Sequence, residues 1–518
     1  MGNLLTSKKR ATSSSAASSV LGISASQLEK SVADHVRQGQ KIVVVQGLGF
    51  VGTAVAAALS AANDASGQPA FFVIGVDLSI DRNRLKIDAL NRGESPIQSP
   101  DSELPQLIRN AVLLRQNLCA TSVEEAYMFA DVIVVDVQLD IRDRTAHSEI
   151  EVNLKSYEAA IQTVGRLMKP DALVVIETTV PMGTCEKIVK PILEKARKAR
   201  GIQSPLFLAH AYERVMPGPS YIRSIRQFYR TFSGIDAPSR KKVREFLESF
   251  IDTENFPLAE LSEPTSSELA KLLENSYRAA NIAFIHEWTL LAEKIGVNLF
   301  EVIRSIRVRK GTHDNMREPG FGVGGYCLTK DSLLAQWGAK HLFKTKIALK
   351  TTLQALKVNY EMPLHTLELL KELFPKGLKK KTIGVCGISY LPELADTRNS
   401  PSELFVDALQ KAGARVLAHD PFVKNWNERP RIGRCSELTD LIRACDGIVL
   451  TTPHQLYTQL PAKTLIENRT APLAIVDAQN IVSDEKARAY HEAGHRILGV
   501  GKGHWRKLGF QSNVPSKT

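Results

Sequence analysis

The sequence predicts an α/β protein in which two Rossmann-like, doubly wound domains are joined by a central all-helical domain. In both halves of the chain, short apolar runs alternate with helical stretches, a pattern typical of βαβ units and a parallel sheet. Between the halves, residues 264–339 have helical periodicity instead. The apolar runs are Ile42–Gln46, Phe71–Val76, Val132–Val137 and Leu173–Glu177 in the first half, and Thr382–Ile388, Arg415–His419, Gly447–Thr451 and Ala474–Asp477 in the second.

The expected domain boundaries follow from where these patterns change. Residues 1–40 are rich in Ser and Ala and lack a sustained apolar period, so we expect a flexible leader with a short helix at Ser26–Arg37. Residues 41–250 are expected to form the first Rossmann domain and residues 251–375 the central helical domain. The second Rossmann-like domain then occupies residues 376–518.

Composition and charge exclude several classes of protein. Of the 518 residues, 43% are hydrophobic and 24% are charged, as in a folded globular protein. The net charge of +12 favours an anionic partner, but no nucleic-acid-binding motif accompanies it, so we expect no nucleic-acid partner. The six cysteines occur singly and no apolar run is long enough to span a bilayer, which predicts a cytoplasmic protein.

The N-terminus carries a short pattern that resembles a lipidation signal. Met1, Gly2 and Thr6 match the N-myristoylation template, and Lys8–Arg10 could add an electrostatic anchor. Because such a short template often matches by chance, we expect a tail that is not anchored to a membrane.

A glycine motif follows the first predicted strand. Gly47 allows a tight turn, Gly49 lets the backbone approach a pyrophosphate, and Gly52 lets the next helix pack closely on the strand. The following strand leads to Asp77, whose carboxylate can accept hydrogen bonds from ribose hydroxyls and so favours NAD over its 2′-phosphorylated relative. We therefore predict that NAD is bound by Gly47, Gly49, Phe50, Val51, Gly52 and Asp77.

A second glycine-rich loop precedes a single cysteine, Cys327. Its glycines leave the backbone free to lie against a ligand, which suits a nucleophile. Asp331 lies four residues after Cys327, so a helix that begins here would place both side chains on one face. The alternative is a buried apolar cysteine beside a loop. The glycines are Gly320, Gly322, Gly324 and Gly325.

Two polar residues share one face of the long helix predicted between the domains. Lys271 and Asn275 are four residues apart, so both side chains could point into one cleft. On spacing alone, a solvated helix face is the simpler interpretation.

Five ordered motifs resemble those of the UDP-glucose/GDP-mannose dehydrogenase family over about residues 41–505. One of them, Tyr212–Gly218, is most similar to the branch that oxidises UDP-N-acetylmannosamine or UDP-N-acetylglucosamine. The resemblance implies that two NAD oxidise the C6 alcohol of a nucleotide sugar to the carboxylate, feeding polysaccharide biosynthesis. It also implies a homodimer that forms through the central helix, and a last domain that binds the sugar nucleotide. The other motifs are Gly47–Gly52, Thr178–Thr184, Glu268–Asn275 and Gly324–Cys327.

The resemblance also implies roles for the polar residues of the two oxidation steps. Lys271, aided by Asn275 and water, would stabilise the developing alkoxide or accept the proton during the first hydride transfer. Cys327 would then attack the aldehyde as a thiolate, and loss of a second hydride would turn the thiohemiacetal into a thioester. A helix N-terminus at Cys327, together with Lys330 and Lys271, is expected to lower the pKa of the thiol.

Hydrolysis of the thioester completes the implied reaction. Glu213 is the candidate base, and Asp331 and Thr179 would orient or polarise the water. Arg398, in a motif that resembles the entry to the family's last domain, could pair with a phosphate or the sugar. The expected substrate-binding residues are Glu213, Arg214, Lys271, Asn275, Gly322, Gly324, Gly325 and Arg398, and Thr179 is also expected to contact NAD.

Three positions depart from the family's pattern. Tyr326 replaces the more usual His or Ser before the cysteine, and Leu391 stands where a substrate-binding Lys is usual. The segment Asp136–Asp140 replaces a Thr-Pro segment. Loss of a Lys beside a diphosphate could remove a charge-assisted hydrogen bond worth about 1.5–3 kcal/mol. These departures affect the expected sugar more than the expected reaction.

A pattern near the C-terminus, His491–His495, matches the HExxH motif of zinc proteases. That motif needs a continuous helix, whereas Gly494 is a poor helix former and residues 496–500 are predicted to form a strand. We therefore expect no metal site.

Two other functions remain open from the sequence. A two-electron hydroxyacid-type dehydrogenase would share the nucleotide-binding fold but would have no use for Cys327. A nucleotide-sugar-binding or regulatory protein without turnover would be compatible with the departures at Leu391 and Asp136–Asp140. The number of NADH formed per sugar separates the three: two for the favoured enzyme, one for the hydroxyacid type and none for the binding protein.

Overall fold

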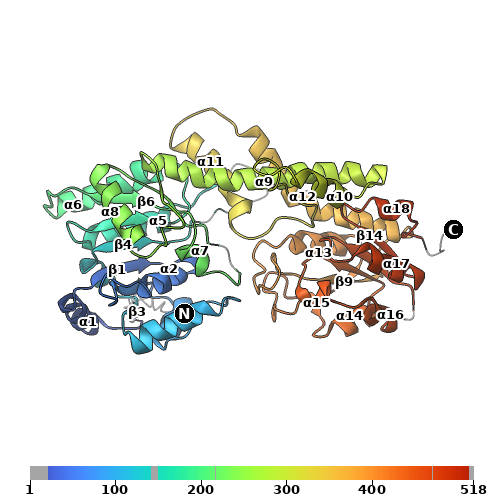
Figure 1. Ribbon diagram of the computed structural model, residues 1–518, viewed down its shortest axis with the longest axis horizontal. Coiled ribbons are helices and arrows are strands. Elements are labelled where there is room, and N and C mark those ends of the chain that lie inside the picture. Colours follow the sequence, from blue (N-terminus) through green and yellow to red (C-terminus); the bar gives the residue numbers. More distant parts are fainter. Residues whose placement is uncertain (1–20, 140, 142–149, 216–217, 470, 513–518) are drawn as a thin grey trace, which may run out of the picture.

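The apolar runs form two sheets, one in each half of the chain, and a long helix lies along both halves (Figure 1). The computed structural model describes residues 21–139, 141, 150–215, 218–469 and 471–512. The predicted fold class, two Rossmann-like domains with a helical connection, is confirmed. The lipidation pattern at the N-terminus lies outside the described residues, and so does Asp140.

The first sheet has the strand order β3-β2-β1-β4-β5-β6-β7-β8. All its pairings are parallel except that of β6 with β7. The strand order reverses between β1 and β4, and ligands of such sheets bind at the carboxyl ends of the strands beside that point. The strands are β1 (Lys41–Gln46), β2 (Phe71–Val76), β3 (Leu118–Thr121), β4 (Val132–Val135), β5 (Leu173–Ile176), β6 (Phe207–His210), β7 (Thr231–Gly234) and β8 (Ala259–Glu260).

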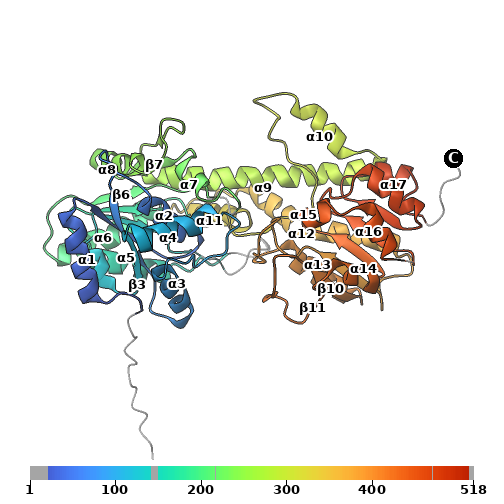
Figure 2. The ribbon, with the colours of Figure 1, turned by 60° about the horizontal axis from the view of Figure 1, so that its bottom comes forward.

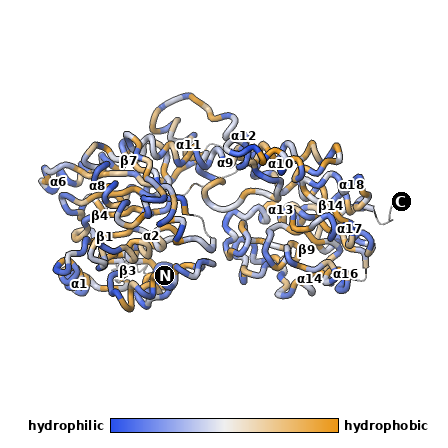
Figure 3. The backbone as a smooth tube through the Cα atoms, viewed as in Figure 1, coloured by the Kyte–Doolittle hydropathy of each residue, from blue (hydrophilic) through white to orange (hydrophobic). Residues whose placement is uncertain are grey.

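Helices cover both faces of this sheet, so its strands are almost wholly apolar and buried. Figure 3 shows the apolar strands inside each domain and more polar segments around them. The helices are α1 (Ala25–Arg37), α2 (Phe50–Ser60), α3 (Asp81–Asn91), α4 (Glu103–Arg109), α5 (Lys155–Leu167), α6 (Lys190–Ala199), α7 (Arg223–Arg226) and α8 (Ala237–Glu248).

Helix α1 lies within the segment expected to be a flexible leader, yet it packs on the first sheet. Leu28 and Val32, four residues apart, are buried in the same core as Ile42 of β1. The ring of His35 stacks on Phe72 of β2 with 4.1 Å between the centroids. An amphipathic helix of this kind buries its apolar stripe against the sheet and becomes part of the domain.

The central helix α9 (Pro264–Ile295) connects the two halves. Proline occupies its first turn, and Gly296, with a φ of 75°, ends it in the left-handed conformation that favours glycine. Figure 2 shows α9 running along both domains while α10 (Leu299–Arg307) projects from the body. Helices α11 (Cys327–His341) and α12 (Lys350–Leu373) pack against α9.

The second sheet repeats the architecture of the first. Its order is β11-β10-β9-β12-β13-β14 and all its pairings are parallel, so its strand order also reverses beside its first strand. The strands are β9 (Thr382–Cys386), β10 (Arg415–His419), β11 (Gly433–Arg434), β12 (Gly447–Leu450), β13 (Ala474–Asp477) and β14 (Arg496–Gly499). The helices are α13 (Pro401–Lys411), α14 (Leu438–Ala444), α15 (Gln455–Thr458), α16 (Ala462–Glu467), α17 (Asp484–Glu492) and α18 (His504–Lys507).

The HExxH pattern does not lie on one helix. Helix α17 ends at Glu492, and Gly494, with a φ of 86°, turns the chain into β14. His491 and His495 are therefore not one helical turn apart on a common face. The described part of the chain contains no group of three or more His, Cys, Asp or Glu side chains placed to hold a metal ion. Nor does any described helix combine the length and apolar character needed to cross a membrane.

Two glycines of the first turn make a matched pair for a stability test. A Cβ at Gly52 would lie 1.9 Å from the carbonyl oxygen of Gly47, whereas a Cβ at Gly49 would meet nothing within 4 Å. We expect Gly52→Ala to lower the free energy of unfolding by about 1–3 kcal/mol and Gly49→Ala to change it by less than about 1 kcal/mol. Urea unfolding without cofactor measures both, and equal stability of the two variants would contradict the tight packing at Gly52.

Candidate active site

The turn between β1 and α2 has the geometry of a dinucleotide site. Gly47 has a φ of 100°, and its N–H donates to the carbonyl of Val76 at 2.8 Å. Gly49 is the N-cap of α2, so the free N–H groups of the first helical turn lie beside it. The open space around Gly49 leaves room for a pyrophosphate at this helix end. The residues present therefore fit NAD.

Asp77 follows β2 and is fixed at the edge of this turn. Its Oδ2 accepts a hydrogen bond from the Leu48 N–H at 3.3 Å, and its Oδ1 accepts one from Asn83 Nδ2 at 2.9 Å. The carboxylate is thus held beside the glycine turn, where a ribose would lie.

The polar residues of α9 and α11 meet at a buried contact. Asn275 of α9 donates from Nδ2 to Oδ2 of Asp331 at 2.6 Å. The hydroxyls of Ser276 and Ser332 are hydrogen-bonded at 2.9 Å beside them. Asp331 is fully buried, and its Oδ1 accepts a hydrogen bond from Lys330 Nζ at 2.9 Å. Both carboxylate oxygens are therefore satisfied.

Cys327 is the first residue of α11, one helical turn before Asp331. Lys271 lies one turn before Asn275 on α9 and donates from Nζ to the carbonyl oxygen of Glu213 at 2.8 Å. The spacing predicted in the sequence thus places Lys271, Asn275, Cys327 and Asp331 in one cluster between the helices. A thiol, an ammonium group and an amide are brought together where the segment after β6 reaches α9.

The pKa of the Cys327 thiol is raised to about 11. Part of the Cys327 residue is exposed to solvent, but the surrounding protein shields its sulfur from water. This desolvation of the thiolate is the main cause of the raised pKa. The negative charge of Asp331 raises the pKa further, and the opposing charges of Lys271 and Lys330 do not compensate. The expectation of a lowered thiol pKa is therefore wrong for the chain without ligands.

The glycine-rich loop before Cys327 packs tightly on the second Rossmann domain. Gly325 has a φ of 79°, and a Cβ there would lie 2.7 Å from the ring of Tyr390. A Cβ at Gly324 would lie 2.5 Å from Cβ of Tyr390, and one at Gly322 would lie 2.6 Å from Cβ of Pro401. A side chain at any of these three positions would clash with Tyr390 or Pro401, so only glycine can occupy them. The loop can therefore hold the cysteine close to the nucleotide-binding edge of the last domain.

Arg398 connects the two Rossmann domains. Its guanidinium donates to Asp396 at 2.8 and 2.6 Å, and its central carbon lies 4.7 Å from the centre of the Phe50 ring and 5.2 Å from that of Tyr326. The Tyr326 hydroxyl also accepts a hydrogen bond from Gln138. The first turn of α2, the cysteine loop and the last domain therefore converge at Arg398.

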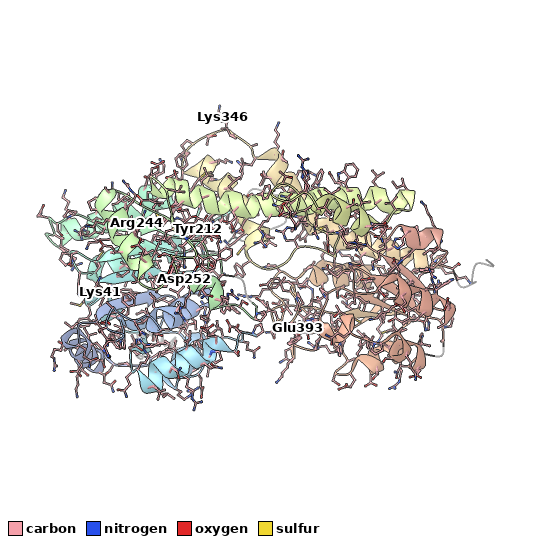
Figure 4. All side chains as sticks on the ribbon, in the orientation of Figure 1. Lys41, Tyr212, Arg244, Asp252, Lys346 and Glu393 are labelled. Atoms are coloured by element: carbon pink, nitrogen blue, oxygen red, sulfur yellow. The ribbon has the colours of Figure 1, made fainter. Side chains whose placement is uncertain are left out.

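Figure 4 helps to locate this region. Tyr212 lies in the first domain beneath α9, and Glu393 lies on the side of the last domain that faces the first. The Tyr212 ring is 5.3 Å from Lys271 Nζ, and Glu393 belongs to the same loop as Tyr390.

Some of the expected site residues point elsewhere. Arg214 forms an ion pair with Glu274 at 3.0 Å and also donates to the carbonyl of Tyr229. The Glu213 carboxylate accepts a hydrogen bond from the Val215 N–H, but it remains near the site, where its negative charge adds to the raised pKa of Cys327. Leu391 is 38% exposed and brings no charge to the site. Thr179 lies half-buried after β5, and the rest of the Tyr212–Gly218 motif at Met216 and Pro217 lies outside the described residues.

Glu268 also belongs to the site, although its residue type and spacing do not predict a role for it. It is buried one turn before Lys271, and its carboxylate accepts hydrogen bonds from the N–H groups of Gly183 and Cys185. Burial raises its pKa to about 7. Glu268 therefore ties α9 to the loop after β5. In the sequence, the position of Glu268 at the start of the Glu268–Asn275 motif is the signal that could have identified it.

Comparisons with known proteins agree with this arrangement. Models of the UDP-glucose/GDP-mannose dehydrogenase family match with the NAD binding domain at residues 40–249, the central domain at residues 265–361 and the UDP binding domain at residues 384–484. UDP-N-acetyl-D-mannosamine dehydrogenases from Methanocaldococcus jannaschii and Pyrococcus horikoshii are 27% and 29% identical to this chain. These alignments cover 90% and 89% of this chain and 97% and 99% of the relatives.

Solved structures are similar over the same length. The NDP-N-acetyl-D-galactosaminuronic acid dehydrogenase from Methanosarcina mazei Go1 is 29% identical, with a TM-score of 0.75 over 92% of this chain and 98% of that one. The UDP-D-ManNAc dehydrogenase from Pyrococcus horikoshii is 27% identical, with a TM-score of 0.76 over 89% of this chain and 100% of that one.

The raised thiol pKa gives a direct test of the site's electrostatics. Without ligands, we expect iodoacetamide to alkylate Cys327 slowly at neutral pH, with a rate that rises toward a pKa of about 11. Asp331→Asn should shift this profile to lower pH because it removes a negative charge, and Lys330→Met should shift it to higher pH. Peptide mass spectrometry follows the labelling, with Cys327→Ser as the unlabelled control. An Asp331→Asn profile that is unchanged or moves upward would refute this assignment of charges.

Proposed function

Because this chain belongs to the UDP-glucose/GDP-mannose dehydrogenase family, we propose that its substrate is a UDP-N-acetylhexosamine, which it oxidises at C6 to the uronate. It is an NAD-dependent oxidoreductase that acts on a nucleotide sugar, as the sequence predicts. The choice of sugar is supported by the printed activities of the relatives from Methanocaldococcus jannaschii and Pyrococcus horikoshii. The main support for this reaction is the cluster that forms where α9 meets α11, which consists of Cys327, Asp331, Asn275 and Lys271.

The first oxidation converts the C6 alcohol to an aldehyde. NAD bound at the glycine turn would supply the hydride acceptor, and the alcohol proton would pass to a water beside Lys271. The hydrogen bond to the Glu213 carbonyl fixes the Lys271 ammonium, which can stabilise the developing alkoxide. Asn275, oriented by Asp331, can donate a further hydrogen bond to the same oxygen only if its amide partly leaves that carboxylate.

The second oxidation keeps the aldehyde on the protein. The Cys327 thiolate attacks the aldehyde carbon, the oxygen takes a proton, and a thiohemiacetal forms. Transfer of a second hydride to a second NAD, with loss of the hydroxyl proton, would then give a thioester. Since the thiol pKa is about 11 without ligands, the thiol must lose its proton during catalysis, and Lys271 and Lys330 are the cations that favour this loss.

Water then cleaves the thioester to give the carboxylate and the free thiol. Glu213 is the proposed base that takes a proton from this water, with Thr179 and Asp331 as positioning groups. In the chain without ligands, the Glu213 carboxylate accepts the Val215 N–H, so substrate binding has to turn it toward the water. The balance is two hydrides removed and one water consumed per sugar.

The cysteine loop and the last domain are proposed to hold the sugar nucleotide. The backbone of Gly322, Gly324 and Gly325 would lie against the sugar, and Arg398 would bind a phosphate in exchange for part of its pairing with Asp396. Arg214 would have to leave Glu274 to reach the substrate. A cytoplasmic location is also proposed, because the mechanism needs a reduced Cys327 and a reducing compartment supplies it.

A homodimer is proposed through the exposed side of α9. This helix carries an apolar stripe along its length that the described part of the chain leaves uncovered, and a second copy of the same stripe would bury it. The exposed side chains are Leu269, Leu273, Tyr277, Phe284, Trp288, Leu291 and Ile295.

The dimer is tested by placing charge in the stripe. We expect Leu273→Glu combined with Trp288→Glu to give a monomer in size-exclusion chromatography with light scattering, because both residues are at least half exposed and would face the partner. Leu85→Glu, at a 77% exposed position outside the stripe, is the matched control and should leave the mass unchanged. A wild-type protein that is already monomeric, or a double variant that stays dimeric, contradicts this interface.

The reaction is tested by the yield of NADH. We expect two NADH per sugar with UDP-N-acetylmannosamine or UDP-N-acetylglucosamine, and less activity with UDP-glucose and GDP-mannose. Cys327→Ala should lose the second oxidation, since no thiohemiacetal can form. A yield of one NADH from the wild type would favour the hydroxyacid-type reaction, and no NADH with any sugar would favour a binding protein.

A further inference from the structure

Two buried carboxyl groups face each other beneath the glycine turn. Asp136 is the first residue after β4 and Glu177 the first after β5, so both lie at the carboxyl edge of the sheet beside the reversal of strand order. Asp136 Oδ2 and Glu177 Oε2 are buried, and no described residue donates a hydrogen bond to either. Two carboxylate oxygens without donors are stable together only if one of them carries a proton.

One guanidinium group, from the segment just before β7, binds Glu177 of this pair. Arg230, just before β7, is 2% exposed and donates from Nη1 to Glu177 Oε1 and to the Ala211 carbonyl. Glu213 after β6 also faces the pair, as does Tyr221, whose hydroxyl donates to the Phe50 carbonyl. Among the described residues, three acidic side chains thus interact here, and the charge of Arg230 opposes the raised pKa of both Asp136 and Glu177.

The charges indicate which acid holds the proton. Burial raises the pKa of Asp136 well above its usual value, and the charges of Glu177 and Glu213 raise it further. Burial also raises the pKa of Glu177, but Arg230 opposes this shift. A proton placed between the two carboxyls raises the pKa of Asp136 and lowers that of Glu177. Asp136 is thus the donor and Glu177 the acceptor.

We propose that Asp136 and Glu177 share one proton, carried by Asp136, and that this acid pair, clamped by Arg230, is a positioning device for NAD. Asp136 touches the turn directly: its N–H donates to the Gln46 carbonyl at 2.8 Å, and a Cβ at Gly52 would lie 3.3 Å from its Cβ. A neutral Asp136 keeps negative charge away from the helix end that receives the anionic pyrophosphate. The proposal rests on NAD binding at this turn and not on the identity of the sugar.

The pair makes NAD binding depend on pH. Raising the pH ionises Asp136 and adds a negative charge beneath the turn, so the affinity of the wild-type protein for NAD should fall severalfold. Asp136→Asn keeps the donor but cannot ionise, so its NAD affinity should stay nearly constant over the same range. Asp64→Asn, which removes a fully exposed carboxylate, is the matched control and should behave as the wild type. Fluorescence titration with NAD alone measures these affinities without turnover.

The proton itself is observed by difference infrared spectroscopy of the full-length protein. The carbonyl stretch of a neutral carboxylic acid should be lost as the pH is raised through the range in which NAD affinity falls, in a step separate from that of Glu268, whose pKa is about 7. This band should be absent in Asp136→Asn and unchanged in Asp64→Asn. A band that persists in Asp136→Asn, no band in the wild type, or an NAD affinity with the same pH dependence in both proteins overturns the proposal. An inactive enzyme that keeps the band refutes only the proposed reaction.

The stability of the fold gives an independent measurement. A carboxyl group whose pKa is raised in the folded state makes folding less favourable as pH rises above its unfolded value of about 4. Thermal unfolding should therefore show the Asp136→Asn variant gaining stability relative to the wild type between about pH 5 and pH 9. A constant difference across this range would show that Asp136 is ionised in the folded protein, against the proposal.

Discussion

The site depends on the buried contact between α9 and α11. The hydrogen bond from Asn275 to Asp331 fixes the rotation of both helices, and Lys330 balances the charge of Asp331 within the same contact. Because side chains four residues apart share a helix face, this one contact also sets where Lys271 and Cys327 lie. Loss of either partner would leave a buried polar group unsatisfied, which costs about 1–3 kcal/mol and disturbs every other member of the cluster.

Two further connections join this contact to the Rossmann domains. Glu268 ties α9 to the loop after β5, and the glycine loop packs on Tyr390 of the last domain. Arg398 then reaches back to Phe50 at the start of α2. The dinucleotide turn, the cysteine and the sugar-nucleotide domain are thereby held by one set of side chains, which suits a reaction in which two hydrides leave the same carbon.

The sequence predicts the parts of the site that depend on local spacing. The glycine turn with Asp77, the pair Lys271 and Asn275, and the pair Cys327 and Asp331 all follow from helix or strand periodicity. Other features depend on contacts between residues far apart in the chain, and no local pattern encodes them. The partner of Arg214, the acceptor role of Glu268 and the packing of α1 are of this kind. The raised thiol pKa was missed because helix and lysine charges are visible in a sequence, whereas desolvation is not.

Cys327 is proposed to hold the sugar covalently between the two oxidations, and the whole reaction depends on this bond. The most direct measurement is peptide mass spectrometry of Glu213→Gln after it is mixed with NAD and UDP-N-acetylmannosamine and quenched in acid. Since this variant lacks the proposed base for hydrolysis, an acyl adduct with the mass of the oxidised nucleotide sugar should accumulate on the peptide that contains Cys327. Turnover to the uronate without any adduct, or release of free aldehyde, would contradict the account.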